Sequence, residues 1–225
     1  MPTLAFSASF EGMTAMRAAR TGLLTALAIL AASLGAGPDA RAQGEAAFPA
    51  VSVGASPLGD ARPIAAWVDF CGAYVQECAV ERAEPARIAL TPAIWGTINA
   101  VNRRINRSLR AVTDQDHWGR PDRWDLGEDG LADCEDFQLR KRRLLAETGL
   151  PRRAMRMTVV IDEKGEGHAV LTLITDRGDF ILDNKTNAVL AWHETGYVFI
   201  KRERQDALAW ASLGGLAAPI VTANR

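Results

Sequence analysis

The stretch GHAVLTLITDRGDFILDN, residues 167–184, decides the fold. Its two apolar runs, 168–174 and 180–183, flank a turn signal at residues 176–178, a pattern that is typical of a β-hairpin. Further short apolar or alternating runs, separated by turn residues, occupy residues 155–161, 189–192 and 197–201. The second half of the chain therefore predicts an antiparallel sheet.

The register of this hairpin predicts which side chains meet. If residues 176–177 form a two-residue turn, Thr175 lies opposite Gly178, and the numbers of opposed residues sum to 353. His168 and Asp183 sum to 351, so they become diagonal neighbours on one face of the sheet, within reach of each other. A bulge in the turn would change this register.

A first long helix is predicted upstream of the sheet. Thr91 offers an N-cap, Pro92 follows at the first helical position, and apolar residues recur at helical spacing as far as residue 109. Asn99 and Asn102 are assigned to the wetter side of this helix, with no chemical role.

A second helix is predicted to begin at Asp133 and to stop at Gly149, and its first turn contains Cys134. Helices that precede a run of antiparallel strands pack on one face of the sheet. We therefore expect an α+β domain with helices packed on an antiparallel sheet.

The composition limits the class of protein. The chain has 225 residues, of which 48% are hydrophobic and 24% charged, and its formal net charge is -1. These values are typical of a soluble globular domain and argue against a nucleic-acid partner.

The N-terminus predicts export. A basic segment at residues 16–20, an apolar stretch at 23–34 and a small-x-small site at 40–42 together predict a signal peptide over residues 1–42. The alternative is a membrane anchor that is not cleaved. Residues 43–62 are rich in Ala, Gly, Pro and Ser and predict a flexible leader, and the domain is expected over 63–225. We expect the mature protein to be periplasmic.

The three cysteines are interpreted in the light of export. In an oxidising compartment Cys71 and Cys78, which are close in sequence, can pair as a disulfide and leave Cys134 unpaired. The start of a helix favours a thiolate at Cys134 because unpaired N–H groups and a partial positive charge lie there. A buried structural thiol or an intermolecular disulfide is the alternative.

Three carboxylates surround this cysteine, those of Asp133, Glu135 and Asp136. They oppose ionisation of the thiol, and a bound hard dication such as calcium would offset their charge. Asp133 and Glu135 are therefore candidate calcium ligands, and Asp136 is a weaker one. In the alternative without a metal, Asp133 is a helix cap and the other two are first-turn acids.

A catalytic triad can be assembled from Cys134, His168 and Asp183. The carboxylate would fix the imidazole tautomer, and the imidazole would assist the thiol. A zinc site with the same three residues is a weaker interpretation, because the chain lacks paired CxxC or HxxxH spacing. For His168 the plain alternative is a strand-end histidine bonded to a loop carbonyl, and for Asp183 it is a turn opener.

Several short motifs occur in order along the chain. They are Trp118-Gly119, Asp122-Arg123-Trp124, Asp133-Cys134-Glu135-Asp136-Phe137, Gly149-Leu150-Pro151, Gly167-His168-Ala169-Val170-Leu171 and Leu182-Asp183-Asn184. Together they resemble the bacterial transglutaminase-like cysteine proteinases. The segment 125–130 departs from the proline-bearing stretch of the LapG-type members.

This resemblance implies a papain-like or transglutaminase-like core with Cys134 as nucleophile, His168 as base and Asp183 as the third member. It also implies calcium held by Asp133 and Glu135. The LapG-type proteases clip large surface adhesins and so release a biofilm, and an inner-membrane receptor for cyclic di-GMP sequesters them. A protein-glutamine transamidase, a non-catalytic calcium-dependent periplasmic binding protein and a purely structural exported domain are the rival readings.

Overall fold

The computed structural model describes residues 46–217. The predicted signal peptide, residues 1–42, and the first residues of the predicted leader lie outside this range. Among the residues described, no helix combines the length and the apolar character needed to cross a bilayer.

Seven strands form one sheet in the order β1-β9-β8-β4-β5-β6-β7, and every neighbouring pair is antiparallel. The strands are β1 (Gly59–Ala61), β4 (Met155–Ile161), β5 (Gly167–Thr175), β6 (Gly178–Leu182), β7 (Leu190–Ala191), β8 (Val198–Glu203) and β9 (Trp210–Ala217). Each predicted strand is present. Strands β1 and β9 at one side of the sheet were not predicted.

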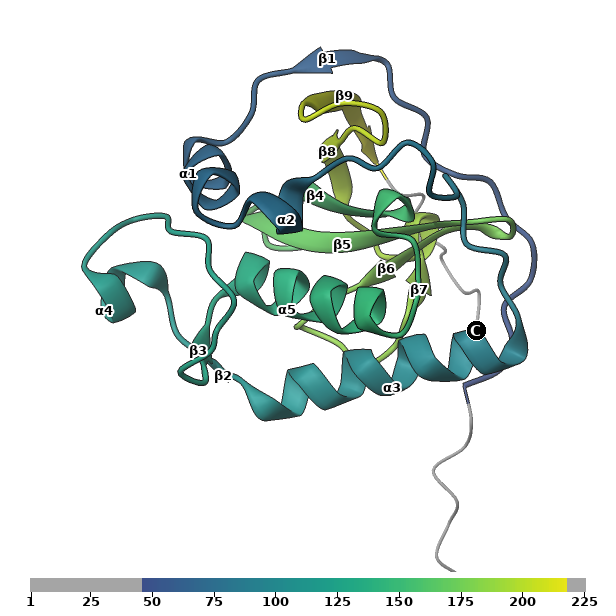
Figure 1. The fold of residues 1–225 in the computed structure, drawn as a ribbon, viewed down its shortest axis with the longest axis horizontal. Coiled ribbons are helices and arrows are strands. Elements are labelled where there is room, and N and C mark those ends of the chain that lie inside the picture. The colour runs from purple at the N-terminus through teal and green to yellow at the C-terminus, as the bar shows by residue number, and fades with distance from the viewer. Residues whose placement is uncertain (1–45, 218–225) are drawn as a thin grey trace, which may run out of the picture. The chain divides into compact units, whose positions relative to one another are not determined.

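The α-helices are α1 (Ala65–Ala73), α2 (Val75–Cys78), α3 (Pro92–Ser108), α4 (Asp114–Trp118) and α5 (Cys134–Glu147), and short 3-10 helices cover Arg152–Ala154 and Trp192–Glu194. A two-stranded parallel pair, β2 (Arg110–Ala111) and β3 (Leu131–Ala132), precedes α5. Helices α5 and α3 lie on the same side of the sheet, with α5 the nearer to β5 (Figure 1). The predicted α+β class is confirmed.

The two long helices begin where their capping residues predict. The hydroxyl oxygen of Thr91 accepts a hydrogen bond from the amide of Ile94 at 3.2 Å, and Pro92 is the first residue of α3. Asp133 is the N-cap of α5, and its amide donates to the Asp136 carboxylate at 3.4 Å. The main apolar core lies between these helices and the sheet and includes Trp95, Ile98, Leu139, Leu145, Met157, Leu171 and Leu173.

The predicted disulfide between Cys71 and Cys78 is present and joins α1 to α2, with the two Cα atoms 5.4 Å apart. The residue before Cys78 anchors this corner to α5, because the Glu77 carboxylate pairs with Arg143 at 2.8 Å and with Arg152. The corner is therefore held both covalently and by charge.

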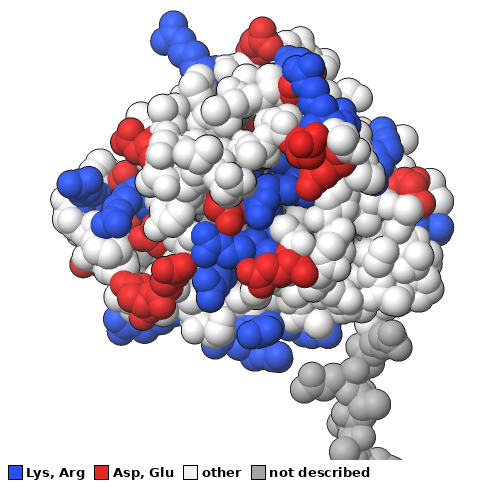
Figure 2. All heavy atoms as spheres, viewed as in Figure 1, with Lys and Arg blue, Asp and Glu red and all other residues white. Residues whose placement is uncertain are grey.

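A buried ion pair holds the middle of α5 against β8. The Arg142 guanidinium donates to Glu203 at 2.7 Å, and the Trp67 indole of α1 donates to the same carboxylate at 2.6 Å. On the outer surface, acidic and basic side chains alternate over the face drawn in Figure 2, with no extended field of one sign.

The predicted flexible leader is ordered against the sheet in its described part. Residues 47–61, here called the N-terminal strap, pass over the sheet and end in β1 (Gly59–Ala61), which pairs with β9. Ala55 is buried, its amide donates to Asp179 at 3.0 Å, and its carbonyl accepts from Arg202 at 3.0 Å. The ordered part therefore starts before Pro63, because donors on the sheet bind the backbone of a segment that has little apolar surface of its own.

Candidate active site

The β5–β6 hairpin has the predicted register. Its paired residues run from Leu171 opposite Leu182 to Thr175 opposite Gly178, so the two-residue turn carries no bulge. The expected diagonal contact is present, because His168 Nε2 lies 2.9 Å from Asp183 Oδ1. Both side chains are buried.

The Asp183 carboxylate accepts two further hydrogen bonds. The amide of Lys185 donates to Oδ1 at 3.0 Å, and the hydroxyl of Tyr197 donates to Oδ2 at 2.7 Å. Burial opposes ionisation, but the donors from His168, Lys185 and Tyr197 outweigh it and hold the pKa of Asp183 below its ordinary value. The carboxylate is therefore the stable form beside the imidazole.

Helix α3 fixes the loop that follows Asp183. The Asn106 side-chain amide donates to the carbonyl oxygens of Asp183 and Thr186, each at 2.9 Å. Asn102 donates to Thr186 at 3.3 Å and to Asn187 at 3.2 Å. Asn102 is fully buried, so its assignment to the wetter side of α3 was wrong, and Asn99 is buried too. The loop supplies backbone acceptors that make a buried asparagine acceptable.

A second buried polar group lies below the same loop, on the face of α5 that carries Cys134. Gln138 and Lys141 follow Cys134 by four and seven residues, a spacing that places all three on one helical face. The Lys141 ammonium donates to Gln138 at 3.2 Å, and the Gln138 amide lies 3.4 Å from the Asn184 side chain. Burial lowers the pKa of Lys141 to about 7, although the Asp183 charge acts in the opposite direction.

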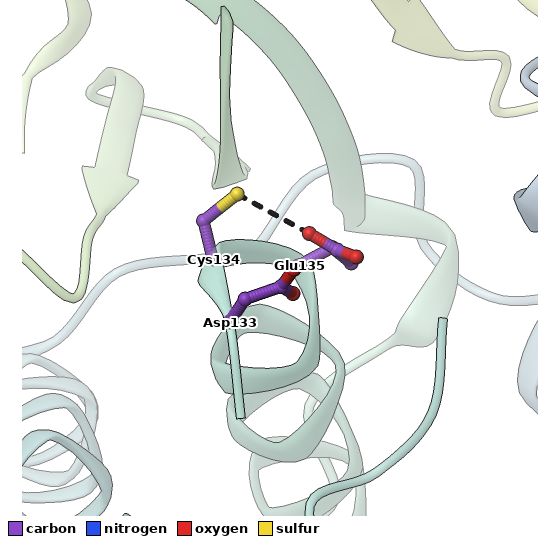
Figure 3. Close-up of side chains that lie close together, drawn as sticks. All are labelled: Asp133, Cys134 and Glu135. Atoms are coloured by element: carbon purple, nitrogen blue, oxygen red, sulfur yellow. Dashed lines mark hydrogen bonds between the residues drawn. The ribbon is translucent and has the colours of Figure 1, made fainter. Parts of the chain in front are cut away.

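Cys134 is the first residue of α5, is half-buried and carries a free thiol. Its sulfur donates to Glu135 Oε2 at 3.2 Å, and Figure 3 shows both side chains at the start of the helix beside Asp133. Burial and the charges of Glu135 and Asp133 raise the pKa of Cys134 well above its ordinary value, while the nearby amide of Ala169 lowers it. The expected depression of this pKa by the helix start is thus overridden by burial and by the neighbouring carboxylates.

Five carboxylates crowd beside this thiol. Oxygen atoms of Asp114, Asp122 and Glu135 lie within 4.8 Å of one another, as do those of Asp114, Asp133 and Asp136. Asp114 and Asp122 were not predicted for this cluster. Asp114 opens α4, whose N-cap Thr113 was a local signal, but nothing in the sequence places α4 beside the start of α5.

The cluster is poorly neutralised by the protein's own groups. Burial, with the other carboxylates contributing, raises the pKa of Asp133 to about 6 and that of Asp136 to about 8, and raises the pKa of Glu135 well above its ordinary value. Oδ1 of Asp133 and Oε1 of Glu135 are buried without a hydrogen-bond partner in the described chain. Crowded oxygen ligands with unused lone pairs fit a hard cation such as calcium.

The other two histidines do not take part in the His168–Asp183 pair, although His117 lies on the same short helix as Asp114. His117 bonds Asp129 at 2.8 Å, and His193 lies edge-on to the neighbouring Trp192 ring. The structure therefore groups the predicted site residues into a His168–Asp183 pair on the hairpin and an acidic cluster around Cys134, with the thiol beside the residue that follows His168.

The chain is similar to proteins of known family and structure. A family model described as bacterial transglutaminase-like cysteine proteinase matches residues 59–217. The fold is similar to Legionella pneumophila LapG, at 22% identity over 54% of this chain and 70% of that one, with a TM-score of 0.47. The calcium-bound LapG structure is 17% identical over 69% of this chain and 92% of that one, with a TM-score of 0.45. The EGTA-treated LapG structure is 24% identical over 48% of this chain and 62% of that one, with a TM-score of 0.43. No curated protein sequence matches significantly.

Proposed function

This chain belongs to the bacterial transglutaminase-like cysteine proteinase family and is a cysteine protease, and on that premise we propose that Cys134, His168 and Asp183 are its catalytic triad. The observation that carries the proposal is the buried 2.9 Å contact between His168 and Asp183. The free thiol lies at the start of α5, beside the amide of the residue that follows His168.

In the proposed reaction, His168 takes the thiol proton and the Cys134 sulfur attacks the carbonyl carbon of a peptide bond. The leaving amine takes the proton from His168, which leaves an acyl-enzyme that water then hydrolyses, with His168 again as base. Asp183 holds Nε2 of the imidazole, so Nδ1 is the nitrogen left for the thiol proton. The free amides at the start of α5 would stabilise the oxyanion.

We further propose that calcium binds at the acidic cluster, with Asp133 and Glu135 as ligands and with Asp114 and Asp122 available to complete the set. The unpaired buried oxygen atoms of Asp133 and Glu135 support this. Asp136 is a weaker ligand candidate, because its Oδ1 already accepts the amide of Asp125 at 2.6 Å. Bound calcium would supply positive charge that lowers the pKa of the neighbouring thiol.

The substrate and partner are proposed from the sequence motifs that resemble LapG-type proteases, and the location from the predicted signal peptide over residues 1–42. We propose a periplasmic enzyme that releases a large surface adhesin and that an inner-membrane cyclic di-GMP receptor sequesters. A protein-glutamine transamidase would instead form an acyl-enzyme from the side-chain amide of a glutamine, with ammonia as the leaving group, and would transfer the acyl group to an amine in place of water. The bond that is broken and the acceptor therefore distinguish the two activities.

The test compares the surface proteins of cells that carry the wild-type chain with those of cells that carry Cys134→Ala. We expect a surface protein to be shortened and released only with the wild-type chain. Cleavage that persists with Cys134→Ala would contradict the proposal. A surface protein that keeps its length but carries an amine joined to a glutamine side chain would favour the transamidase. A thiol that alkylates no faster than an unfolded cysteine would favour a non-catalytic binding protein.

Calcium is tested separately, by calorimetry on chelator-stripped protein and by the alkylation rate of Cys134 with iodoacetamide. Calcium should bind with a measurable heat and should accelerate alkylation at neutral pH. In the double variant Asp133→Asn/Glu135→Gln we expect no heat of calcium binding and no effect of calcium on the alkylation rate. The control is Glu147→Gln, which lies at the far end of α5 and should behave as wild type. Full activity and unchanged alkylation in excess EGTA would leave the carboxylates as helix caps.

A further inference from the structure

We propose that Tyr197 is a positioning residue of this site: its hydroxyl holds Oδ2 of Asp183, so that Oδ1 stays directed at His168. The inference rests on the proposed triad and extends it to a residue that the motifs do not contain. Tyr197 lies just before β8 and far from Asp183 in the ordered sheet, since β4 and β5 separate β8 from β6.

The Asp183 carboxylate is held by donors on both of its oxygen atoms. Tyr197 donates to Oδ2 at 2.7 Å, while His168 and the amide of Lys185 donate to Oδ1 at 2.9 Å and 3.0 Å. The Tyr197 ring also meets the His168 ring edge to face, with centroids 5.9 Å apart and planes at 83°. One side chain thus contacts both the imidazole and the carboxylate that orients it.

The backbone before Tyr197 forms a tight turn that places its hydroxyl next to Asp183. Gly196 adopts φ of +75°, a left-handed conformation that favours glycine, and the amide of Tyr197 donates to the Thr195 hydroxyl at 3.2 Å. The ring is buried in a small apolar cluster with Val160, Val170 and Phe199. Phenylalanine would fill this cluster equally well, so the hydroxyl is the part of the residue that packing does not explain.

The phenol remains a donor at every pH at which the enzyme would work. Burial, followed by the hydrogen bond to Asp183, raises the pKa of Tyr197 far above its ordinary value. The other charged groups that face this site are Lys141 of α5, Lys185 of the loop, and Asp162 and Glu163 of the β4–β5 turn. Of these, Lys185 is already paired with Asp162. Tyr197 therefore acts as a neutral donor, and it does not titrate with the triad.

Removal of the hydroxyl leaves Oδ2 of Asp183 buried without its partner. Hydrogen bonds to an ionised carboxylate favour the charged form, so Tyr197→Phe should raise the pKa of Asp183. The carboxylate would also be free to rotate, and His168 would no longer be held in the single tautomer with the proton on Nε2. Both effects can be measured without a known substrate.

The test uses the calcium-loaded full chain and iodoacetamide as the probe of Cys134. In Tyr197→Phe we expect the acid limb of the alkylation profile to move to higher pH by about one to two units. The reason is that Asp183 supports the His168 imidazolium beside the thiolate only while it is ionised, and its raised pKa shifts that ionisation to higher pH. Nitrogen-15 NMR of the three histidines should show the His168 signals change from one tautomer to a mixture. Tyr74→Phe, the only other tyrosine, is the matched control and should leave both measurements unchanged.

An unchanged alkylation profile together with an unchanged His168 tautomer would overturn the proposal. If Tyr197→Phe does not fold, 3-fluorotyrosine incorporated into the Tyr74→Phe chain makes the Tyr197 phenol a stronger donor, and the acid limb should move downward. The NMR measurement repeated in Cys134→Ala reads the Tyr197–Asp183–His168 contacts alone. A failure of the proposed catalysis is thereby distinguished from a failure of this inference.

Discussion

The buried lysine below the candidate site gives a quantitative prediction. Lys141 is fully buried, and within residues 46–217 its ammonium has one hydrogen-bond partner, Gln138. Burial lowers its pKa from an ordinary value of 10.5 to about 7. At 1.36 kcal/mol per pKa unit, the folded chain bears a cost of about 5 kcal/mol for this charge below about pH 7. Between about pH 7 and 10.5 the unfolded chain binds the proton more tightly, so this cost falls as the pH rises.

Lys141→Met keeps the length of the side chain and removes the charge. Relative to wild type, the variant should gain up to about 5 kcal/mol in the free energy of unfolding near pH 6, and about 2 kcal/mol near pH 9. The measurement is urea unfolding at both pH values with calcium present throughout, and the fluorescence of the six tryptophans monitors the transition.

Lys164→Met is the matched control, because Lys164 is exposed in the β4–β5 turn. Its effect should stay within about 0.5 kcal/mol at both pH values. If the stability curves of wild type and Lys141→Met run parallel from about pH 6 to 9, the lysine carries no buried charge that titrates in this window, and the reasoning is refuted.

Three further outcomes are expected. Asp183→Asn should keep the fold but lower turnover by about 10³-fold or more, because the amide fixes the wrong imidazole tautomer; near-normal turnover would remove Asp183 from the triad. Cys71→Ser/Cys78→Ser should lose about 2 kcal/mol in urea unfolding, whereas a midpoint that dithiothreitol does not move would show that the disulfide is not stabilising. In EGTA, stability should fall as the pH rises from the ordinary pKa of 3.8 to the raised pKa values of about 6 for Asp133 and about 8 for Asp136, because over this range only the folded chain keeps these protons. Calcium should flatten this dependence, as thermal unfolding with and without EGTA would reveal.

The parts of the site that could be predicted are those that a local rule determines. A two-residue turn fixes the register of a hairpin, so the contact between His168 and Asp183 followed from their numbers alone. Thr91 and Asp133 are residue types that favour the N-cap position, and each stands at the N-cap of its helix. The Thr91 side chain accepts a hydrogen bond from a free amide of α3. Each of these inferences involves residues that lie close together in the chain.

Contacts made across the fold could not be predicted in this way. Tyr197 reaches Asp183, and Asp114 reaches the start of α5, only because the sheet and α4 bring them there. The electrostatic prediction for Cys134 considered the helix start and its neighbours, but burial contributes most to its pKa, and burial depends on the whole domain. Strand β9 was missed because its Gly214 and Gly215, both with positive φ, weaken the strand pattern.

The N-terminal strap determines where a shortened chain can begin without losing hydrogen bonds between the strap and the rest of the domain. Indole and guanidinium groups of the folded body hold its carbonyl oxygens in turn: Trp95 bonds Ala47, Arg177 bonds Pro49, Trp192 bonds Val53 and Arg202 bonds Ala55. A fragment cut at residue 63 would strip these donors of their acceptors, remove an edge strand and leave the Arg202–Asp179 pair uncovered. A shortened version made for crystallisation or screening should therefore begin no later than residue 46, well ahead of residue 59, where the match to the family model begins.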